Sequence, residues 1–356
     1  MFKERISAIN EFLDNNTAAL ITDDCNRLYF TGFNSSAGAV LITKNRCIFL
    51  IDFRYFEKAK QTVKHLEVVL CRNLYGQIAE ILKAEGITEL LIEADSVTLS
   101  AFKRITDALS DFTVSSDTAL SRKIAALRSI KSKNELDLIK KAQALTDKTF
   151  SYISDRISAG RTEKEIMLDM EFFIRKEGSE GVSFDFIVVS GKNSSLPHGV
   201  PTDKKIETGD FVTMDFGAVV GGYRSDMTRT VAVGKADSLQ TEVYNTVLDA
   251  QKAAIDAIKP DAICCDVDKI ARDIIANAGY GNCFGHGLGH SVGLEIHENP
   301  ACNTRDTTPL KEGMIMTVEP GIYIENRFGV RIEDMVYVTS NGIENLTGSP
   351  KNLIIL

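Results

Sequence analysis

Four carboxylates occupy positions where apolar strands would normally place hydrophobic residues. Asp215 lies in FVTMDFGAVV and Asp226 follows eleven residues later, while Glu319 lies in IMTVEPGIY and Glu333 in GVRIEDMVYV. Burying an ionised carboxylate in such a segment costs several kcal/mol unless a cation meets it. Because two divalent cations would neutralise four carboxylates, a two-metal site explains all of these positions together.

The histidines favour the same interpretation. His286, His290 and His297 fall within the Gly-rich stretch FGHGLGHSVGLEIHENP, and His198 lies in LPHG. A lone histidine is more often a hydrogen-bonded core residue, but four of the five histidines share such Gly-rich contexts. The fifth, His65 in TVKHLEVV, has no such neighbours, and we assign it no role.

Each of these features also has a purely structural interpretation. Asp215 could cap a turn, Asp226 could be a solvated surface residue, and Arg331 could pair with Glu333 on a half-exposed strand. Against this, a Gly-Gly turn separates the two aspartates, and such a turn favours a hairpin that brings both carboxylates to one point.

The ligand types indicate the chemistry. An oxygen-rich set with a single imidazole suits Mn(II), Co(II) or a similar ion better than structural zinc. Two such ions about 3.5–4 Å apart would lower the pKa of a shared water and polarise a substrate carbonyl. The stretch GHSVG has GxSxG spacing, but a two-metal site requires no separate serine nucleophile. The sequence contains no P-loop or strand-linked GxGxxG, so nucleotide-binding functions have no support. The pattern predicts a two-metal hydrolase.

The elements that must position these residues begin with an α/β pattern. A helix is predicted over 1–14, followed by strands at AALITDD, AGAVLITKN and RCIFLID. Helices near 53–64 and 75–85 then flank the strand LEVVLC, and ELLIEA is a further strand. Alternating strands and helices are typical of an α/β domain with a partly parallel sheet.

The rest of the chain repeats one pattern. A long helix (134–158) and a second helix (162–177) lead into the strand SFDFIVVSG. A long helix (238–258) and a second helix (265–278) later lead into the histidine-rich stretch. Each half therefore contributes helix, helix and strands, and each supplies part of the charged cluster.

These patterns define the predicted fold. The chain has 356 residues, which is long enough for two domains. We predict an α/β N-terminal domain, residues 1–125, followed by an α+β pseudo-symmetric catalytic domain, residues 126–356. The functional site is expected between the two halves of the second domain.

Composition limits the partners. The net charge is 41 − 49 = −8, which disfavours nucleic acid or an anionic membrane as a partner. Seven cysteines without a CxxC pair favour reduced thiols over a disulfide framework or a zinc knuckle. The N-terminus has an amphipathic pattern rather than that of a signal peptide, and no apolar run approaches the ~20 residues that span a bilayer. We expect a cytoplasmic protein.

The motifs resemble those of the methionine aminopeptidase, prolidase and aminopeptidase P superfamily of pita-bread metallopeptidases. SGKNSSLPHG, MDFGAVVGGYRSDMTRT, GHGLGHSVGLEIHE, MTVEPGIY and GVRIED resemble its proline-specific branch. NRLYFTGFNSSAGAVLIT and IDFRYFEKA resemble the small creatinase-like α/β domain that precedes the catalytic domain there. The resemblance covers nearly the whole chain and implies a pita-bread catalytic domain with two divalent metal ions, Mn(II) ahead of Co(II) or Zn(II).

The resemblance also implies a set of metal ligands. The implied ligands are Asp215, Asp226, His290, Glu319 and Glu333. Asp215 would chelate one ion, His290 and Glu319 would hold the other, and Asp226 and Glu333 would bridge both.

Further residues receive implied roles in substrate binding and catalysis. His297 would hydrogen-bond the substrate carbonyl and stabilise the oxyanion, and His198 would contact the peptide near the scissile bond. His286 would line the pocket for the proline ring. Arg331 would bind near the substrate and, with Tyr323, hold ligand carboxylates. Glu319, besides binding metal, would shuttle a proton.

The implied reaction is attack of a metal-bridging hydroxide on an Xaa-Pro bond. Dipeptide-specific prolidases often carry an Arg shortly after the HE-x-P segment, where this chain has Ala301, although Arg305 lies four residues on. We therefore expect an Xaa-Pro aminopeptidase that releases the first residue of longer peptides, with Xaa-Pro dipeptidase (prolidase) as the alternative. A non-catalytic peptide-binding relative is disfavoured because such proteins usually lose metal ligands. The family also implies a homodimer or higher homo-oligomer.

Overall fold

The chain forms two compact units. The computed structural model describes residues 2–356 and divides them into an N-terminal unit, Met1–Arg128, and a C-terminal unit, Ser129–Leu356. The division falls after Arg128, where the sequence analysis placed it near residue 125. An apolar cluster that includes Leu20, Leu41 and Leu50 lies in the N-terminal unit, and two further clusters lie in the C-terminal unit.

A six-stranded sheet with the order β4-β3-β2-β1-β5-β6 forms the centre of the N-terminal unit. The strands are β1 (Thr17–Ile21), β2 (Ala39–Ile42), β3 (Cys47–Ile51), β4 (Glu67–Leu70), β5 (Glu89–Ile92) and β6 (Thr113–Ser115). The pairs β1–β2 and β2–β3 are antiparallel, whereas β3–β4, β1–β5 and β5–β6 are parallel. The predicted α/β domain with a partly parallel sheet is confirmed.

Helices accompany this sheet, and every residue of β1 and β2 is buried, as expected for strands covered on both faces. The helices are α1 (Phe2–Phe12), α2 (Asp24–Thr31), α3 (Phe53–Thr62), α4 (Leu74–Ala84), α5 (Leu99–Ala108) and α6 (Ala119–Ser129). Asp23, Asp52, Asn73 and Thr98 begin four of them, and each side chain accepts a backbone N–H of the first turn.

The first half of the C-terminal unit packs two helices against a three-stranded sheet, ordered β11-β8-β7. Its elements are α7 (Lys133–Ser154), α8 (Glu163–Lys176), β7 (Ile187–Ser190), η1 (Gly191–Ser195), β8 (Phe211–Phe216), β9 (Val219–Val220), β10 (Tyr223–Arg224) and β11 (Met227–Ala232). Capping boxes begin both helices, formed by Ser132 with Glu135 and by Thr162 with Glu165.

The second half repeats this arrangement with a five-stranded sheet, ordered β13-β12-β14-β17-β18. Its elements are α9 (Ser238–Ala257), α10 (Cys264–Asn277), η2 (Gly281–Cys283), β12 (Gly289–Ser291), β13 (Glu298–Cys302), β14 (Ile315–Val318), β15 (Gly321–Ile324), β16 (Phe328–Arg331), β17 (Asp334–Val338) and β18 (Ile343–Asn345). The predicted repetition of helix, helix and strands is therefore present.

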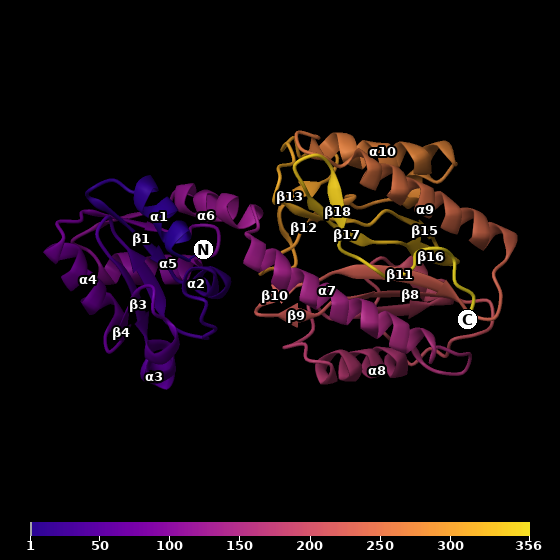
Figure 1. Ribbon diagram of the computed structural model, residues 1–356, viewed down its shortest axis with the longest axis horizontal. Helices are drawn as coiled ribbons and strands as arrows, with labels where there is room; N and C mark the ends of the chain where they lie inside the picture. The colour runs from indigo at the N-terminus through magenta and orange to yellow at the C-terminus, as the bar shows by residue number, and fades with distance from the viewer. Residues whose placement is uncertain (1) are drawn as a thin grey trace. The chain divides into compact units, whose positions relative to one another are not determined.

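Within the C-terminal unit, Figure 1 shows α9 and α10 on one side of the strands and α7 and α8 on the other. One apolar cluster joins α9 and α10 to the strands of the second half, and the other joins α7 and α8 to β7, β8 and β11. The strands thus lie between two helix pairs, which leaves their ends and connections free to carry polar residues.

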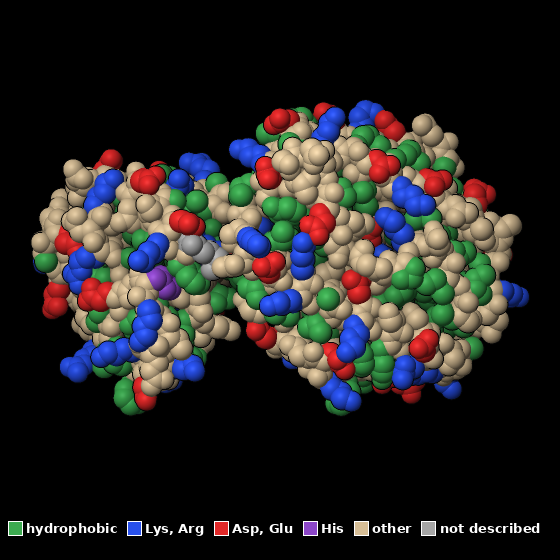
Figure 2. All heavy atoms as spheres, in the orientation of Figure 1, with side chains coloured by type: hydrophobic (Ala, Val, Ile, Leu, Met, Phe, Trp, Pro, Cys, Tyr) green, Lys and Arg blue, Asp and Glu red, His purple; other side chains and the backbone are tan. Residues whose placement is uncertain are grey.

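The surface carries both signs of charge. On the face shown in Figure 2, basic and acidic side chains are interspersed. Among the residues that the structure describes, no helix has the length and apolarity needed to cross a bilayer.

Candidate metal centre and substrate pocket

Asp215 and Asp226 come together because the chain between them folds back on itself. Gly221 and Gly222 have φ angles of 59° and 79°, which L side chains rarely adopt, and they form the two-residue turn between β9 and β10. Beyond this turn β8 pairs with β11, so that Asp215 lies opposite Thr228, two residues after Asp226. The hairpin predicted from the Gly-Gly pair is present.

Glu319 and Glu333 lie at the ends of strands rather than within them. Glu319 follows β14 directly, and Glu333 lies in the link between β16 and β17. The sequence analysis placed both inside apolar strand-like runs, and the runs are real. The carboxylates nonetheless fall just outside the strands, where Glu319 N donates to the Leu288 carbonyl oxygen at 2.8 Å and Glu333 N to that of Thr228 at 3.1 Å.

His290 on β12 faces these carboxylates. Its Nδ1 lies 3.1 Å from the Ser291 carbonyl oxygen, which can only accept, so Nδ1 carries the hydrogen and Nε2 is the atom that points to the cluster. Nε2 lies 3.3 Å from Glu319 Oε1 and 3.6 Å from Asp226 Oδ2. Nε2 without a hydrogen and each of these carboxylate oxygens can only accept, so a cation or a proton is required between them.

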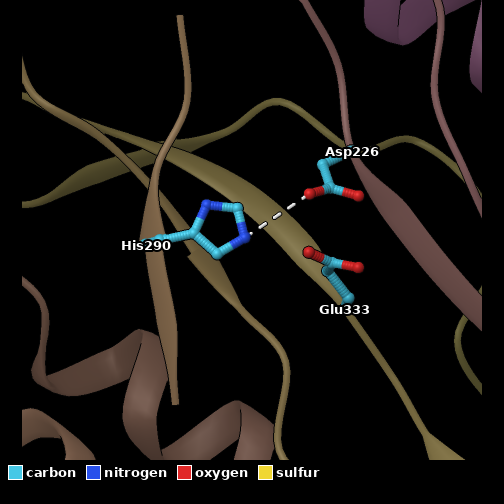
Figure 3. A group of neighbouring side chains, drawn as sticks. All are labelled: Asp226, His290 and Glu333. Carbon is cyan, nitrogen blue, oxygen red and sulfur yellow. Dashed lines mark ion pairs between the residues drawn. The ribbon is translucent and has the colours of Figure 1, made fainter. Parts of the chain in front are cut away.

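Figure 3 shows the ring of His290 on one side and the carboxylates of Asp226 and Glu333 on the other. Among the described residues these three form a group whose ligand atoms all lie within 4.8 Å of one another. Because they come from β12, the β10–β11 link and the β16–β17 link, both halves of the unit contribute to one point.

Arg331 pairs with Asp215 rather than with Glu333. Its Nη2 donates to Asp215 Oδ2 at 2.7 Å, and its Nε donates to Thr228 Oγ1 at 3.0 Å. Thr228 Oγ1 in turn donates to Glu333 Oε2 at 2.7 Å. Arg331 therefore orients one carboxylate directly and a second one through Thr228. Its substrate-binding role stays a prediction.

The electrostatics of the cluster follow from burial and mutual repulsion. Burial raises the pKa of Asp226 well above its ordinary value, and the neighbouring carboxylates add to the shift. Burial likewise raises the pKa of Glu333. Burial would also raise the pKa of Glu319, but the hydrogen bond and charge of His290 outweigh it and lower that pKa to about 2. The cluster thus lacks positive charge at the Asp226–Glu333 side.

The unsatisfied oxygens indicate where a cation fits. Asp215 Oδ1 and Glu333 Oε1 are buried without a hydrogen-bond partner among the described residues. Leaving a buried carboxylate oxygen unpaired is costly. Oxygen atoms with one imidazole form the donor set preferred by hard or borderline divalent ions. The residues present therefore fit the predicted divalent metal ions.

A pocket of about 1180 Å³ opens onto this cluster. Its lining includes the four histidines singled out from the sequence: His198, His286, His290 and His297. His198 and His297 are exposed, and the ring of His297 lies 4.4 Å from that of His290, centroid to centroid. The structure thus brings all the predicted histidines to one cavity, which belongs to the C-terminal unit alone.

His286 lines the pocket but has both ring nitrogens occupied. Nδ1 lies 2.8 Å from the Gly287 carbonyl oxygen, so it carries the hydrogen, and Nε2 accepts from Tyr323 Oη at 2.9 Å. Tyr323 Oη accepts in turn from Arg331 Nη1 at 2.9 Å. His286 consequently offers a ring face, rather than a hydrogen bond, to whatever enters the pocket.

Two supports escaped the sequence analysis. Thr317 Oγ1 accepts the backbone N–H of His290 at 3.0 Å and donates to Glu319 Oε1 at 3.2 Å, so it joins two cluster members. Thr228 Oγ1 likewise accepts from Arg331 Nε and donates to Glu333 Oε2, so it joins those two residues. In the sequence, Thr228 lies two residues after Asp226 and Thr317 two residues before Glu319, and this spacing was the available signal for both.

Helix α10 fixes the approach to β12. Arg272 donates to Asp268 at 2.8 Å through each of two nitrogens and to the carbonyls of Phe284 and His286 at 3.0 and 2.8 Å. Asp268 also accepts the Leu288 N–H at 3.0 Å. The glycine-rich segment before His290 is thus held by one side-chain pair.

Comparisons with known proteins show the family of the chain. Residues 137–340 match the model of metallopeptidase family M24, and residues 5–130 match that of the creatinase/prolidase N-terminal domain. A solved Xaa-Pro dipeptidase from Bacillus anthracis is 42% identical, with a TM-score of 0.95 over 100% of both chains. An Xaa-Pro dipeptidase from Pyrococcus furiosus is 38% identical over 99% of this chain and 100% of its own length. A solved X-Pro aminopeptidase from Thermotoga maritima is 37% identical, with a TM-score of 0.90 over 98% of this chain and 100% of its own.

Proposed function

Since the chain belongs to metallopeptidase family M24, we propose that it is an Xaa-Pro dipeptidase that hydrolyses the bond before a C-terminal proline. The observation that carries the proposal is the cluster of four carboxylates with His290, of which Asp215, Asp226, His290 and Glu319 line the pocket. The sequence analysis favoured an Xaa-Pro aminopeptidase. The relatives that bear the name Xaa-Pro dipeptidase support its alternative better.

In this proposal two divalent ions, with Mn(II) as the physiological metal, bind to Asp215, Asp226, His290, Glu319 and Glu333. When bound, they supply Lewis-acid activation of a water molecule and of the substrate carbonyl. Asp226 and Glu333 would bind both ions. The oxygens of Asp215 and Glu333 that lack hydrogen-bond partners among the described residues support this assignment.

The remaining roles belong to protein groups that face the pocket. His297 donates a hydrogen bond to the scissile carbonyl oxygen, where negative charge develops. His198 contacts the peptide beside the scissile bond, and the ring face of His286 packs against the proline. Glu319 accepts a proton from the attacking water and delivers it to the leaving proline nitrogen, which has no hydrogen of its own.

The argument for a dipeptide depends on a cation for its terminal carboxylate. Arg305 is not among the residues that line the pocket, whereas Lys164 and Arg175 of α8 are. The side chains of both are about half exposed, at 48% and 47%, and pair with the acidic residues Asp203 and Glu171. Surface pairs of this kind are weak, so either cation is available to a substrate carboxylate.

The aminopeptidase alternative retains one supporting observation. Ala301 lies in the pocket wall at the position where the resemblance leads one to expect Arg in dipeptidases, and the pocket volume of about 1180 Å³ exceeds what a dipeptide needs. A longer peptide would use that space.

Steady-state kcat/KM of the Mn(II)-loaded protein for Ala-Pro, Ala-Pro-amide and Ala-Pro-Ala tests the proposal. We expect Ala-Pro to be the best of the three, because only it carries the carboxylate directly on the proline. Lys164→Met and Arg175→Met, made separately, should lower kcat/KM for Ala-Pro but not for its amide. A preference for Ala-Pro-Ala would make the protein an aminopeptidase, and the absence of hydrolysis of all three would overturn both assignments.

A further inference from the structure

The loop that carries His198 is clamped at both ends by one buried carboxylate. Glu163, the first residue of α8, is 0% exposed. Its Oε1 accepts the N–H and Oγ–H of Ser190 at 2.7 and 2.9 Å. Its Oε2 accepts the N–H and Oγ–H of Thr202 at 3.0 and 2.6 Å. One oxygen therefore holds the start of the segment 191–201 and the other holds its end.

The start of α8 strengthens this clamp. Glu163 N donates to the carbonyl oxygen of Lys204 and Lys164 N to that of Thr202, each at 3.2 Å. These are N–H groups of the first helical turn, which have no acceptor within the helix. Asn193 Nδ2 also donates to both oxygens of Glu163, at 3.1 and 3.2 Å. The carboxylate is fully hydrogen-bonded, as a buried charge must be.

The middle of the segment is held separately, from β16. Arg331 Nη1 donates to the Pro197 carbonyl oxygen at 3.2 Å, and Gly329 N donates to Ser194 Oγ at 2.9 Å. A side chain at Gly329 would place its Cβ 2.1 Å from the Ser194 carbonyl oxygen, so only glycine allows this approach. His198 directly follows Pro197 and projects, exposed, into the pocket lining.

We propose that Glu163 is a positioning residue for the substrate: by clamping both ends of the segment 191–201, it fixes the place of His198 at the pocket. The inference deepens the proposed function, on which it rests, since there His198 contacts the peptide. Glu163 itself is buried, is absent from the pocket lining and touches no substrate. Pro197, Gly199, Val200 and Pro201 of the same segment also line the pocket, and the proposal is that the influence of Glu163 passes through His198 rather than through these or the adjacent Lys164.

The variant Glu163→Gln tests this with little change of shape. An amide replaces one carboxylate oxygen by an N–H₂ group, which cannot accept, so the donors at one end of the segment lose their acceptor. Displacement of a substrate-contacting group by about 1 Å costs up to ~10²-fold in rate. We expect kcat/KM for Ala-Pro to fall about 10- to 100-fold in Glu163→Gln, with the Mn(II) content per chain unchanged.

A double-mutant cycle separates positioning from general damage. In a His198→Ala background the further change Glu163→Gln should cost less than about two-fold, because the group that it positions is gone. An equal cost in both backgrounds would overturn the proposal. Glu165→Gln is the matched control, since Glu165 lies in the same helical turn but is exposed, and it should leave kcat/KM unchanged.

A readout without substrate distinguishes failure of this inference from failure of the proposed function. Amide hydrogen exchange in the segment 191–201 should accelerate in Glu163→Gln and not in Glu165→Gln. Unchanged exchange would overturn the clamp even in an active peptidase. Accelerated exchange in a protein that hydrolyses no prolyl peptide would overturn the proposed function and retain the clamp. If Glu163→Gln does not fold, Thr202→Val should show the same pattern at smaller amplitude. It removes the 2.6 Å hydrogen bond to Glu163 together with those that Thr202 Oγ1 accepts from Lys204 N and Asn193 Nδ2.

Discussion

Individual carboxylates carry the site, and they are not equivalent. Asp226 is 4% exposed and Glu333 is 1% exposed. Burial and the neighbouring negative charges both disfavour their ionised forms. Asp215 has Arg331 and Glu319 has His290 as compensating partners. The two carboxylates proposed to bind both ions are therefore the ones least compensated by the protein itself.

Glu333→Gln should consequently weaken metal binding with little loss of folded structure. The amide keeps the hydrogen bond with Thr228 Oγ1, since a carboxamide oxygen can accept it, but loses the charge. We expect Mn(II) per chain, measured by elemental analysis after dialysis, to fall from about two to below one. Two retained ions per chain would contradict the assignment.

His297→Ala should separate catalysis from metal binding. His297 is exposed at the pocket and lies beside His290, yet its proposed role is to donate to the developing oxyanion. Removing one such donor lowers kcat about 10²- to 10³-fold. Metal content should remain that of the unchanged protein, and a loss of metal in His297→Ala would show that the wrong histidine was assigned as ligand.

At the scale of elements, α10 illustrates how a helix fixes a loop. Asp268 is 1% exposed and depends on Arg272 for its neutralisation, while Arg272 also holds the segment 284–286 through two carbonyls. Breaking a buried ion pair by removing one partner typically costs about 3–5 kcal/mol. Because Arg272 is 26% exposed, we expect a cost at the lower end of this range, about 3 kcal/mol.

Arg272→Met should therefore lower the unfolding temperature of the C-terminal unit by roughly 6–12 °C. The same helix offers a control, because Lys269 and Asp273 form an i,i+4 pair whose side chains are 68% and 55% exposed. Lys269→Met should change the unfolding temperature by less than about 2 °C. The unfolding temperatures are measured by circular dichroism. Equal shifts in the two variants would mean that the buried pair stabilises the unit no more than the exposed pair does.

Local patterns predicted the elements well but not their long-range partners. The Gly221–Gly222 turn and the alternating strands identify the hairpin that joins Asp215 to Asp226, because turn chemistry is a short-range property. Arg331 shows the limit. Its nearest acid in sequence is Glu333, but it pairs with Asp215, 116 residues away. Such pairing depends on how the strands are placed in space, which no local pattern encodes.

The same limit explains the supports that sequence analysis did not find. Glu163 looks like an ordinary acidic residue in a first helical turn, where a solvated side chain is the usual outcome. Only the return of Ser190 and Thr202 to that turn makes it a buried clamp. Thr317 was equally unremarkable as a β-branched strand residue until β12 was placed beside β14.

On the scale of the whole molecule, the chemistry is confined to one unit. All five proposed metal ligands lie between residues 215 and 333, within Ser129–Leu356, and the apolar core of the N-terminal unit is separate. A ligand that binds only the folded form stabilises what it binds, by about 2.7 kcal/mol at 100 times its Kd. Metal should therefore stabilise the two units unequally.

Differential scanning calorimetry should show this asymmetry. We expect Mn(II) to raise the transition of the C-terminal unit by roughly 5–11 °C and to leave that of the N-terminal unit in place. Glu333→Gln, which is expected not to retain both ions, should lose most of this shift. Equal movement of both transitions would show that the two units unfold as one cooperative body.

The spread of the cluster along the chain has a consequence for biosynthesis. Asp226 and Glu333 are separated by 333 − 226 = 107 residues. At a translation rate of about 5–20 residues per second, roughly 5–20 s pass between the emergence of these two side chains from the ribosome. A nascent chain in that interval has its hairpin aspartates, gains His290 and then Glu319, and lacks Glu333 until the interval ends. The proposed metal site can therefore be completed only on a nearly finished polypeptide, by metal that is available late in synthesis or after release from the ribosome.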